Sequence, residues 1–482
     1  MTRHAIKITK HQAVFLLFVC GLTTFAGIST WYNYQGSAER GIENGYRVCY
    51  IIPHTHLDPW WLDPWHTEMD RWTTNVRNAL DMMRFDSTMC FVLDQVVAIK
   101  YFWEHYPEYQ QDMLKFIREG RLEIVQGFIS QPELNIVGEI GLIQDAAIGI
   151  KWARDVLGAK ITTGWEIDVF GFGAGTPTFY NKLGLNYSII CRTGIGMWDG
   201  VFNWTGVDGS RIYGYKMPHY DHGYGNDGMV TVTDITNVNE FIRKVSEWIN
   251  PSNNPFQHTV NPDDLSSDQG DLMMFYGSDF SNPNWDLPGF VKAWNAQQAD
   301  KTGFVCKIGT PRMFFDRLGP LLARGGVVRT SITPGRDLNP VFSGYYTSRV
   351  NMKNYTRFFE YKLTTLETFA SIAKQAFPTF TYPEPSFEQA WYKASASHHH
   401  DSITGTSRQP VYEDNMQVFY QEMPILRDLE AQILGTMVDG INTTYQDTTA
   451  RPLVLFNPLG WERTEPVVVP VSMTAFPQAF EN

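Results

Sequence analysis

Two clusters of histidine and aspartate lie far apart along this chain, and they constrain its fold more than any other feature. The first cluster holds His56 and Asp58, directly after the apolar run Tyr50-Ile51-Ile52, a pattern typical of a buried strand that ends in a loop. His56 and Asp58 are two residues apart, so both side chains can reach one cation only where the backbone is extended or turning. One imidazole and one carboxylate make half of a zinc site. The other half must come from elsewhere in the chain.

The second cluster is His399-His400-Asp401, far from either end of the sequence, so it is not a purification tag. The serine and glycine residues around it predict a loop. Each cluster alone also fits a structural interpretation, in which a buried histidine bonds a carbonyl or a polar histidine lies in water. Together the two clusters favour a metal site.

A third segment supplies another carboxylate. In Trp165-Glu166-Ile167-Asp168, apolar and acidic residues alternate as at the end of a strand, glycines follow, and a helix is predicted from Pro177. Asp168 would then project from the C-terminal end of a strand, towards the same face as the first cluster. The alternative is an aspartate that caps the next helix or turn.

Three motifs together resemble the family 38 glycoside hydrolases, the class II α-mannosidases. They are His-Thr-His-Leu-Asp-Pro-x-Trp, Ile-Asp-x-Phe-Gly and His-His-Asp-Ser-Ile-Thr-Gly-Thr, and the resemblance covers residues 46 to 470. It implies an α/β fold with an N-terminal seven-stranded β/α barrel, a three-helix bundle and C-terminal β-domains. It also implies one catalytic zinc ion and retaining hydrolysis of terminal α-linked mannose from N-glycans or free oligosaccharides.

The resemblance assigns roles to particular residues of this sequence. The implied zinc ligands are His56, Asp58, Asp168 and His400, and Asp168 is also the implied nucleophile that forms a covalent mannosyl-enzyme. Retaining glycosidases need two carboxyl groups, one that attacks and one that protonates the leaving oxygen. A metal can hold the sugar ring through its 2- and 3-hydroxyls, so we expect templating more than activation of water. Cobalt could replace zinc among such ligands.

Asp279 is the predicted general acid and base. It follows the apolar run Leu272 to Tyr276, which predicts a buried strand, and Gly277-Ser278-Asp279-Phe280 resembles the family's Gly-x-Asp-Phe. Without that resemblance, a surface turn is the simpler interpretation of Gly-Ser-Asp-Phe. An acid in this role needs a raised pKa, which burial beside apolar groups supplies.

The resemblance also predicts four substrate-binding residues. Trp61 matches a tryptophan that stacks on the sugar, Phe170 a pocket phenylalanine, Arg192 an arginine that contacts the nucleophile, and Asp401 an acid that bonds sugar hydroxyls. Core packing is the alternative for Trp61, because the whole chain is rich in aromatic residues.

The sequence departs from the family's pattern in places that bear on specificity. Trp60 stands where Golgi and lysosomal members often have glycine, and Phe342 stands where they have tryptophan. The segment Met217 to His222 keeps a Tyr-Asp pair but lacks the Pro-His that follows it in Golgi members. The sequence therefore predicts neither the linkage cleaved nor the subclass.

Composition agrees with a large enzyme of more than one domain. The 482 residues are 43% hydrophobic and 14% aromatic, and the formal net charge is −12. This acidic balance argues against nucleic acid as a partner and suits an uncharged glycan. It makes no prediction of oligomeric state.

The N-terminal region predicts entry into the secretory pathway. Basic residues precede a nearly continuous apolar segment at residues 13–28, typical of a signal peptide or a signal anchor with its basic side in the cytoplasm. Four glycosylation sequons support this route weakly, at Asn186, Asn203, Asn354 and Asn442. We expect a lumenal protein, either a type II Golgi membrane protein or a lysosomal or secreted one, in which Cys49, Cys90, Cys191 and Cys306 could form bridges.

The predicted organisation has five parts. They are a signal peptide or anchor (1–30), a stem (31–45), a β/α-barrel catalytic domain (46–340), a helical bundle (341–445) and the truncated start of a β-rich domain (446–482). Strands of this last part are expected at Pro452 to Trp461 and from Val467, and most of the family's C-terminal β-domains are expected to be lacking. Strand-like runs that alternate with helical stretches, such as Gly141 to Leu157 and Phe290 to Ala299, predict the barrel. Two apolar stripes at helical spacing predict the bundle, the first including Phe358 and Phe359 and the second including Phe419. His400 falls in the connection between bundle helices, so the bundle must fold back onto the barrel to complete the metal site.

Two other functions remain open at this level. One is a catalytically inactive, zinc-dependent glycan-binding protein, against which the retained Asp168 and Asp279 argue. The other is a different zinc hydrolase, such as a deacetylase or a peptidase. The sequence contains no His-Glu-x-x-His motif, which argues against a peptidase.

Overall fold

The computed structural model describes residues 46–192, 200–216, 222–225, 228–231, 235–249, 271–322, 330–332, 334–338, 342–442, 444 and 452–468. These residues form two compact units. Of the described residues, the smaller unit holds 368–381 and those from 432 onward, and the larger unit holds all the others. The predicted signal segment and stem lie outside the described residues. Residues 217–221, in the segment Met217 to His222 that departs from the family's pattern, also lie outside them.

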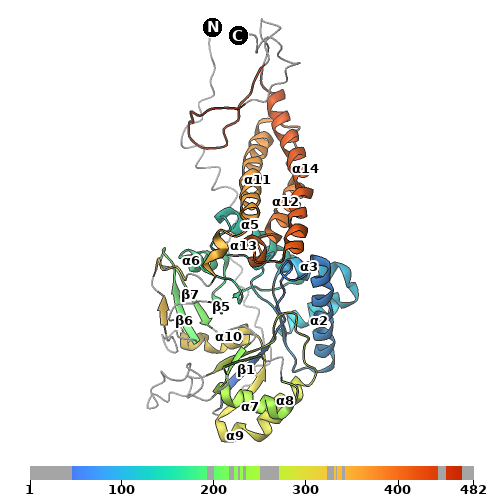
Figure 1. The fold of residues 1–482 in the computed structure, drawn as a ribbon, viewed down its shortest axis with the longest axis vertical. Helices are drawn as coiled ribbons and strands as arrows, with labels where there is room; N and C mark the ends of the chain where they lie inside the picture. The colour runs from blue at the N-terminus through green and yellow to red at the C-terminus, as the bar shows by residue number, and fades with distance from the viewer. Residues whose placement is uncertain are drawn as a thin grey trace. The chain divides into compact units, whose positions relative to one another are not determined.

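Strands and helices alternate over most of the larger unit (Figure 1). The strands are β1 (Arg47–Pro53), β2 (Phe91–Leu93), β3 (Leu122–Ile124), β4 (Thr163–Glu166), β5 (Tyr187–Ile190), β6 (Gly200–Thr205), β7 (Arg211–Lys216), β8 (His222–Gly225), β9 (Gly228–Thr231), β10 (Leu272–Tyr276), β11 (Phe304–Ile308) and β12 (Thr330–Ile332). The helices up to residue 322 are α2 (Trp65–Phe85), α3 (Val96–His105), α4 (Gln110–Arg118), α5 (Glu139–Leu157), α6 (Thr176–Leu183), α7 (Val238–Ile249), α8 (Leu287–Gln297), α9 (Ala299–Thr302) and α10 (Pro311–Leu322). A 3-10 turn, η1 (Pro107–Tyr109), separates α3 from α4.

Strand β1 is the centre of a parallel sheet in the order β10-β1-β11. Strand β1 is buried on both faces between two parallel core strands. A strand in this position needs apolar side chains on both faces, which explains its continuous apolar run. Pro53 of β1 is in register with Tyr276 of β10, so the two strands end at the same edge. The residues that follow each strand, including His56 and Asp279, therefore emerge side by side.

A second sheet carries the segment that leads to Asp168. Its order is β12-β6-β7-β5-β4, with β6 and β7 antiparallel and β4 and β5 parallel. The short pair β2-β3 lies between the two sheets, through a bridge of His54 with Val92 and a bond from Gln126 N–H to the Thr163 carbonyl of 2.7 Å. The described residues do not form the predicted single ring of seven hydrogen-bonded strands. Instead they form separate sheets, and some neighbouring strands are joined only by an isolated bridge or a single hydrogen bond.

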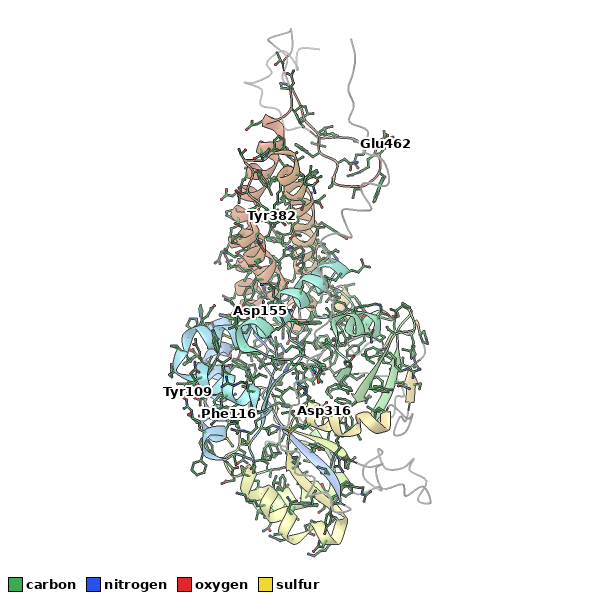
Figure 2. All side chains as sticks on the ribbon, turned by 180° about the vertical axis from the view of Figure 1, so that it is seen from behind. Tyr109, Phe116, Asp155, Asp316, Tyr382 and Glu462 are labelled. Atoms are coloured by element: carbon green, nitrogen blue, oxygen red, sulfur yellow. The ribbon has the colours of Figure 1, made fainter. Side chains whose placement is uncertain are left out.

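Local sequence explains where the helices end. Helix α6 has Pro177 in its first turn and Gly184 as a left-handed cap at φ +82°. Helix α5 ends in the same way at Gly158. The predicted helices at these positions are confirmed, whereas the predicted stretch Phe290 to Ala299 is divided between α8 and α9. Side chains fill the space between helices and strands (Figure 2), and Phe116 of α4 is fully buried.

The region after residue 342 is helical. It contains η4 (Ser343–Tyr346), α11 (Val350–Ala376), α12 (Glu384–Ala396), α13 (His400–Thr404) and α14 (Gln409–Asp439). Within the larger unit, Phe359 of α11 packs on Phe419 of α14, with ring centroids 5.2 Å apart. Phe359 and Phe419 belong to the predicted apolar stripes and are buried, whereas Phe358 of the first stripe is 43% exposed.

Three expectations need correction or limits. The loop predicted around His399 is a short helix, α13, because His399 caps its first turn and Gly405 ends it at φ +75°. The strands predicted at Pro452 to Trp461 and from Val467 are not formed over residues 452–468, where the described residues offer no partner strand and Leu455 and Trp461 are exposed. Cys49, Cys90 and Cys306 are buried thiols without a disulfide, and Cys191 is also buried.

No helix within the described ranges combines the length and the apolar character needed to span a membrane. The predicted anchor at residues 13–28 lies outside those ranges.

Candidate metal centre and active site

The turn after β1 directs His56 and Asp58 towards one point. The His56 N–H donates to the Ser278 carbonyl at 3.1 Å, and the His56 carbonyl accepts from the Phe280 N–H at 2.9 Å. These bonds keep the backbone extended at His56, so the side chain two residues later lies on the same side. The His56 Nε2 and Asp58 Oδ1 atoms are 2.9 Å apart, and both residues are buried.

Asp168 reaches the same point from the end of β4. Its N–H donates to the Gln131 side-chain carbonyl at 3.3 Å, and the guanidinium of Arg192 donates to its Oδ1. The second carboxylate oxygen, Oδ2, is 3.8 Å from His56 Nε2. Asp168 therefore presents one oxygen to Arg192 and the other to the histidines.

His400 comes from α13, between α12 and α14. Both its N–H and its Nδ1 lie within hydrogen-bonding distance of the Gln131 carbonyl, at 3.0 and 3.2 Å. Because a carbonyl only accepts, Nδ1 carries a proton, and Nε2 is the nitrogen that faces the carboxylates. That Nε2 atom lies 3.1 Å from Asp58 Oδ1 and 3.3 Å from Asp168 Oδ2.

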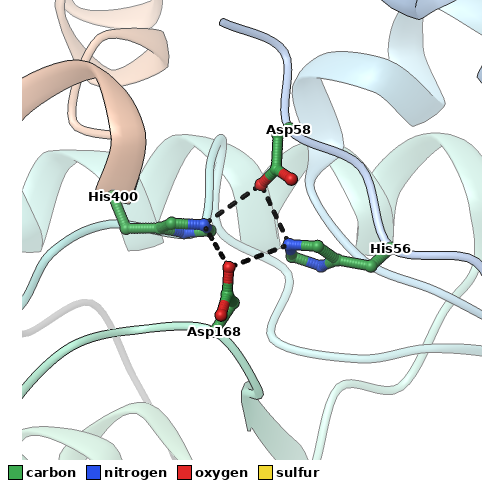
Figure 3. Close-up of side chains that lie close together, drawn as sticks. All are labelled: His56, Asp58, Asp168 and His400. Atoms are coloured by element: carbon green, nitrogen blue, oxygen red, sulfur yellow. Dashed lines mark hydrogen bonds and ion pairs between the residues drawn. The ribbon is translucent and has the colours of Figure 1, made fainter. Parts of the chain in front are cut away.

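The four side chains thus converge on a single buried point (Figure 3). Tetrahedral zinc with bonds of about 2.0–2.1 Å needs ligand atoms roughly 3.3 Å apart. The distances of 2.9 to 3.8 Å between neighbouring ligand atoms bracket this value. Two imidazoles and two carboxylates are also ligand types that zinc accepts, so the residues present fit the metal.

The neighbouring histidines and Arg192 lower the pKa values of Asp58 and Asp168. Burial by itself raises the pKa of Asp58, but the charges and hydrogen bonds of His56 and His400 outweigh it and hold this pKa well below its usual range. The pKa of Asp168 is likewise lowered, against burial, by His400 and Arg192. Both carboxylates are therefore ionised and available as ligands.

Asp279 lies beside the cluster rather than in it. It forms a β-bridge with His56, and it is half-buried at the exit of β10. Burial lowers the pKa of His56, but nearby carboxylates outweigh it and raise this pKa to about 9. Asp58 contributes most to the rise, and the charge of Asp279 contributes less.

Two of the predicted substrate residues pack directly on the four converging side chains. The Phe170 ring lies 5.7 Å from the His400 ring, centroid to centroid, and Arg192 lies over Phe170 at 5.8 Å. The exposed Phe342 contacts both, at 5.4 Å from Phe170 and 5.5 Å from Arg192. Phe342 thus belongs to the rim of this site.

The other two predicted substrate residues differ in exposure. Asp401 is buried, with its Oδ2 atom 3.7 Å from His400 Nε2, and burial together with the charge of Asp58 raises its pKa to about 8. Trp61 is half-buried, and its carbonyl accepts from the Arg408 N–H at 3.0 Å. Trp60 is buried and stacks on Trp65 at 5.0 Å, so it serves packing.

Several buried polar residues support this cluster and were not predicted. Gln131 bonds two members of the cluster, Asp168 and His400. Its side-chain amide also donates to the carboxylate of Asp94 at 3.2 Å. Burial raises the pKa of Asp94 to about 6. No local pattern marks either residue, because both act through contacts distant in sequence.

A second buried group holds the segment before His400. The His398 ring lies between Asp145 of α5, at 3.2 Å, and Glu360 of α11, at 3.7 Å. Lys353 of α11 donates to the carbonyls of Ile403 and Thr404 at the end of α13, at 2.8 and 3.2 Å. Helix α13 is therefore fixed at both ends by charged side chains.

Comparison with known families agrees with this geometry. Residues 47–325 match the N-terminal domain of glycosyl hydrolases family 38, and this match alone spans more than half of the chain. The chain belongs to glycosyl hydrolase family 38. Residues 340–437 match the alpha-mannosidase middle domain.

Curated relatives of this family 38 chain are similar over most of its length. Alpha-mannosidase 2 of Spodoptera frugiperda is 25% identical over 500 residues, covering 87% of this chain and 44% of that protein. Human alpha-mannosidase 2 is 24% identical, covering 79% of this chain and 38% of that protein. The chain thus spans less than half the length of these relatives.

A solved structure shows the same α/β fold. The crystal structure of an alpha-mannosidase from Enterococcus faecalis superposes with a TM-score of 0.71 at 20% identity, covering 87% of this chain and 46% of that one.

Proposed function

We propose that this family 38 chain is a retaining α-mannosidase that removes terminal α-linked mannose from N-glycans or free oligosaccharides. The observation that carries the proposal is the convergence of His56, Asp58, Asp168 and His400, with Asp168 shared between the cluster and Arg192. This arrangement gives one carboxylate an ionised, oriented oxygen beside a cation site. Such an oxygen is suited to attack at an anomeric carbon.

Asp168 is the proposed nucleophile. Its lowered pKa keeps it ionised, and the Arg192 guanidinium fixes its orientation. Attack breaks the bond between the anomeric carbon and the leaving oxygen and forms a mannosyl ester on Asp168. Water then displaces the aspartate and restores the anomeric configuration.

Asp279 is the proposed acid and base. In the first step its carboxyl donates a proton to the leaving oxygen, and in the second step its carboxylate takes a proton from the attacking water. Its place beside His56, on a backbone fixed by two hydrogen bonds, holds it next to the cluster without making it a ligand.

The resident metal in this proposal is one zinc ion, held by His56, Asp58, Asp168 and His400. When bound, it supplies a Lewis-acidic centre for two neighbouring sugar hydroxyls, which orients the ring. Phe170 and Trp61 supply apolar surfaces for the sugar, and Asp401 accepts from its hydroxyls.

The finer architecture belongs to the same proposal. We infer a seven-stranded β/α barrel over residues 46–340, a three-helix bundle over 341–445 and a β-rich domain that starts at 446. The bridges of His54 with Val92 and of His56 with Asp279 support closure of the strands into a ring. The contacts of α11 with α14, such as Phe359 with Phe419, support the bundle.

The proposed location is the lumen of the secretory pathway, in the Golgi membrane or in lysosomes. The sequons support it where their asparagines are exposed, at Asn186, Asn354 and Asn442. Asn203 lies half-buried within β6 and is a poorer acceptor.

The test is hydrolysis of an aryl α-mannoside by the purified protein, with and without a chelator, beside the variant Asp168→Ala. We expect turnover that the chelator removes, that added zinc restores and that Asp168→Ala lacks. His105→Ala, on the exposed end of α3, is the matched control and should retain full turnover.

A folded protein that binds zinc and mannosides without turnover would contradict the proposal. It would favour the second candidate, an inactive glycan-binding protein. The span of less than half of the curated relatives' length favours testing that candidate directly.

A further inference from the structure

Three charged residues at the start of α2 form a fixed group beside the Asp279 loop. Glu68 is fully buried and accepts from the Asp63 N–H at 3.0 Å and from Arg71 Nη1 at 3.2 Å. Arg71 Nη2 also pairs with Asp63 Oδ2 at 2.8 Å. A buried carboxylate thus holds both the backbone of Asp63 and the guanidinium of Arg71.

The outer two members of this group remain open to solvent. The Arg71 side chain is 46% exposed and the Asp63 side chain 32%. A guanidinium has five N–H donors, and a carboxylate has about four acceptor positions. The pair therefore keeps donors and acceptors that a ligand could use, at positions fixed by Glu68.

Short contacts connect this pair to the proposed acid. The Arg71 guanidinium lies 5.9 Å above the ring of Phe280, the residue after Asp279. The Phe280 N–H donates to the His56 carbonyl at 2.9 Å, and its carbonyl accepts from the Asn75 amide at 2.7 Å. The backbone around Phe280 thus connects Arg71 to His56, the proposed metal ligand, through contacts on both sides.

We propose that Asp63 and Arg71 form the subsite for the leaving-group sugar. The inference rests on the proposed function, because the residue that protonates the leaving oxygen must lie beside the leaving group. A sugar on the Asp279 side would meet the Phe280 ring and the adjacent Asp63–Arg71 pair. A paired carboxylate and guanidinium can accept from and donate to neighbouring hydroxyls.

The charges at this place favour a neutral ligand. Burial raises the pKa of Glu68 to about 7, and the guanidinium of Arg71 is already paired with Asp63. An anionic ligand such as a phosphate would therefore meet no unpaired positive charge here. The ligand class that fits is an uncharged saccharide, and the pair would then influence which mannose linkages are cleaved.

The competing explanation is an ordinary surface ion pair. The same helix offers a matched example, because Arg84 pairs with Asp81 at 2.6 Å and with Asp112, at a similar exposure of 41%. Arg84 lies at the other end of α2 and has no contact with the Asp279 loop among the described interactions. Arg84→Ala therefore removes an equivalent charge without removing the proposed subsite.

The experiment compares leaving groups. The kcat/KM ratio of mannobiose to aryl α-mannoside is measured for wild type, Arg71→Ala, Asp63→Asn and Arg84→Ala, using the α1,2-, α1,3- and α1,6-linked disaccharides. We expect Arg71→Ala to lower this ratio roughly tenfold for the preferred linkage, the size of one lost charge-assisted bond. Arg71→Lys should recover it in part, since lysine keeps the charge but not the fork.

An unchanged ratio in Arg71→Ala, or an equal fall in Arg84→Ala, would overturn the subsite. Binding separates this result from failure of the proposed function. If wild type does not hydrolyse the aryl mannoside, the affinities for methyl α-mannoside and for a thio-linked mannobiose are compared instead. A preference for the disaccharide that Arg71→Ala loses supports the subsite, and equal or absent binding of both overturns it.

Discussion

At the scale of single residues, the convergence of His56, Asp58, Asp168 and His400 leads to a direct prediction about metal binding. His400→Ala removes one of two imidazoles from the cluster, whose Nε2 atom lies 3.1 and 3.3 Å from the two carboxylates. The Nε2 atom of the neighbouring His399 lies 3.5 Å from Asp58 Oδ1, and the described contacts do not bring it to Asp168. We expect zinc affinity to fall by roughly a hundredfold or more, because even supporting residues around a metal are worth ten- to a hundredfold. Competition with a chromophoric chelator measures it.

The control for this prediction is His105→Ala, which removes an exposed histidine that bonds only the Tyr101 carbonyl of its own helix. Zinc affinity should be unchanged there. Equal affinity in wild type and His400→Ala would exclude His400 as a ligand.

Glu133 makes a residue-scale prediction about pH. It is buried, it accepts from the Phe170 N–H and the Tyr345 hydroxyl, and burial raises its pKa to about 7. Because the folded-state pKa lies above the unfolded one, the protonated carboxyl favours the folded state. Its stabilisation is complete below about pH 4.5 and is lost as pH rises through about 7.

Glu133→Gln tests this directly, since glutamine is neutral at every pH and can keep both hydrogen bonds. The difference in free energy of unfolding, variant minus wild type, should grow by up to about 3 kcal/mol between pH of about 5 and about 8. Urea unfolding at the two pH values measures it. The same difference at both pH values would refute a raised pKa at Glu133.

At the scale of elements, the short helix α13 shows how the proposed metal ligand His400 is positioned. A helix of five residues has little stability of its own, so its position depends on neighbours. Lys353 of α11 bonds its last carbonyls and the Ser348 carbonyl, at distances of 2.6 to 3.2 Å. We predict that Lys353→Met costs about 1–3 kcal/mol and lowers zinc affinity, because the helix that carries His400 loses its anchor.

Lys362→Met is the matched control for α13. Lys362 lies on the same helix and pairs with Glu430 near the surface, so its loss should cost less than about 1 kcal/mol and leave zinc affinity unchanged. Both quantities come from chemical unfolding and metal competition. Wild-type zinc affinity in Lys353→Met would show that α13 keeps its place without this anchor.

At the scale of the whole molecule, the sequence predicts what local patterns encode. Apolar runs that end in polar residues locate β1, β4 and β10, and so place His56, Asp168 and Asp279 at strand ends. The class of α/β fold follows from the same alternation. Each of these features depends on residues that are neighbours in sequence.

Features that depend on distant contacts were not predictable. Gln131, Glu133 and Lys353 have no distinctive neighbours in sequence. Gln131 nevertheless bonds His400, Glu133 bonds Phe170, and Lys353 bonds the end of α13. The strands expected after Pro452 follow an apolar pattern too, but a strand also needs a partner, and none lies among the described residues.

The same distant contacts predict how zinc affects stability. Two hydrogen bonds near the site join the segment before residue 340 to the segment after residue 342. The His400 N–H donates to the Gln131 carbonyl at 3.0 Å, and the Gly138 N–H donates to the Glu360 carboxylate at 3.0 Å. Since each segment supplies proposed metal ligands, we expect zinc to bind well only when both segments are folded together. Zinc at about a hundred times its Kd should then stabilise the folded state by about 2.7 kcal/mol and raise Tm by a few degrees.

Calorimetry with zinc and with chelator measures this shift on the whole chain. We expect the transition of the larger unit to move as one, and we expect zinc to raise the unfolding temperature of His400→Ala much less than that of the wild type. A transition that splits, with only one part moved by zinc, would mean that the two segments fold independently. The ligands of one segment would then suffice for binding, which contradicts the shared site formed by His56, Asp58, Asp168 and His400.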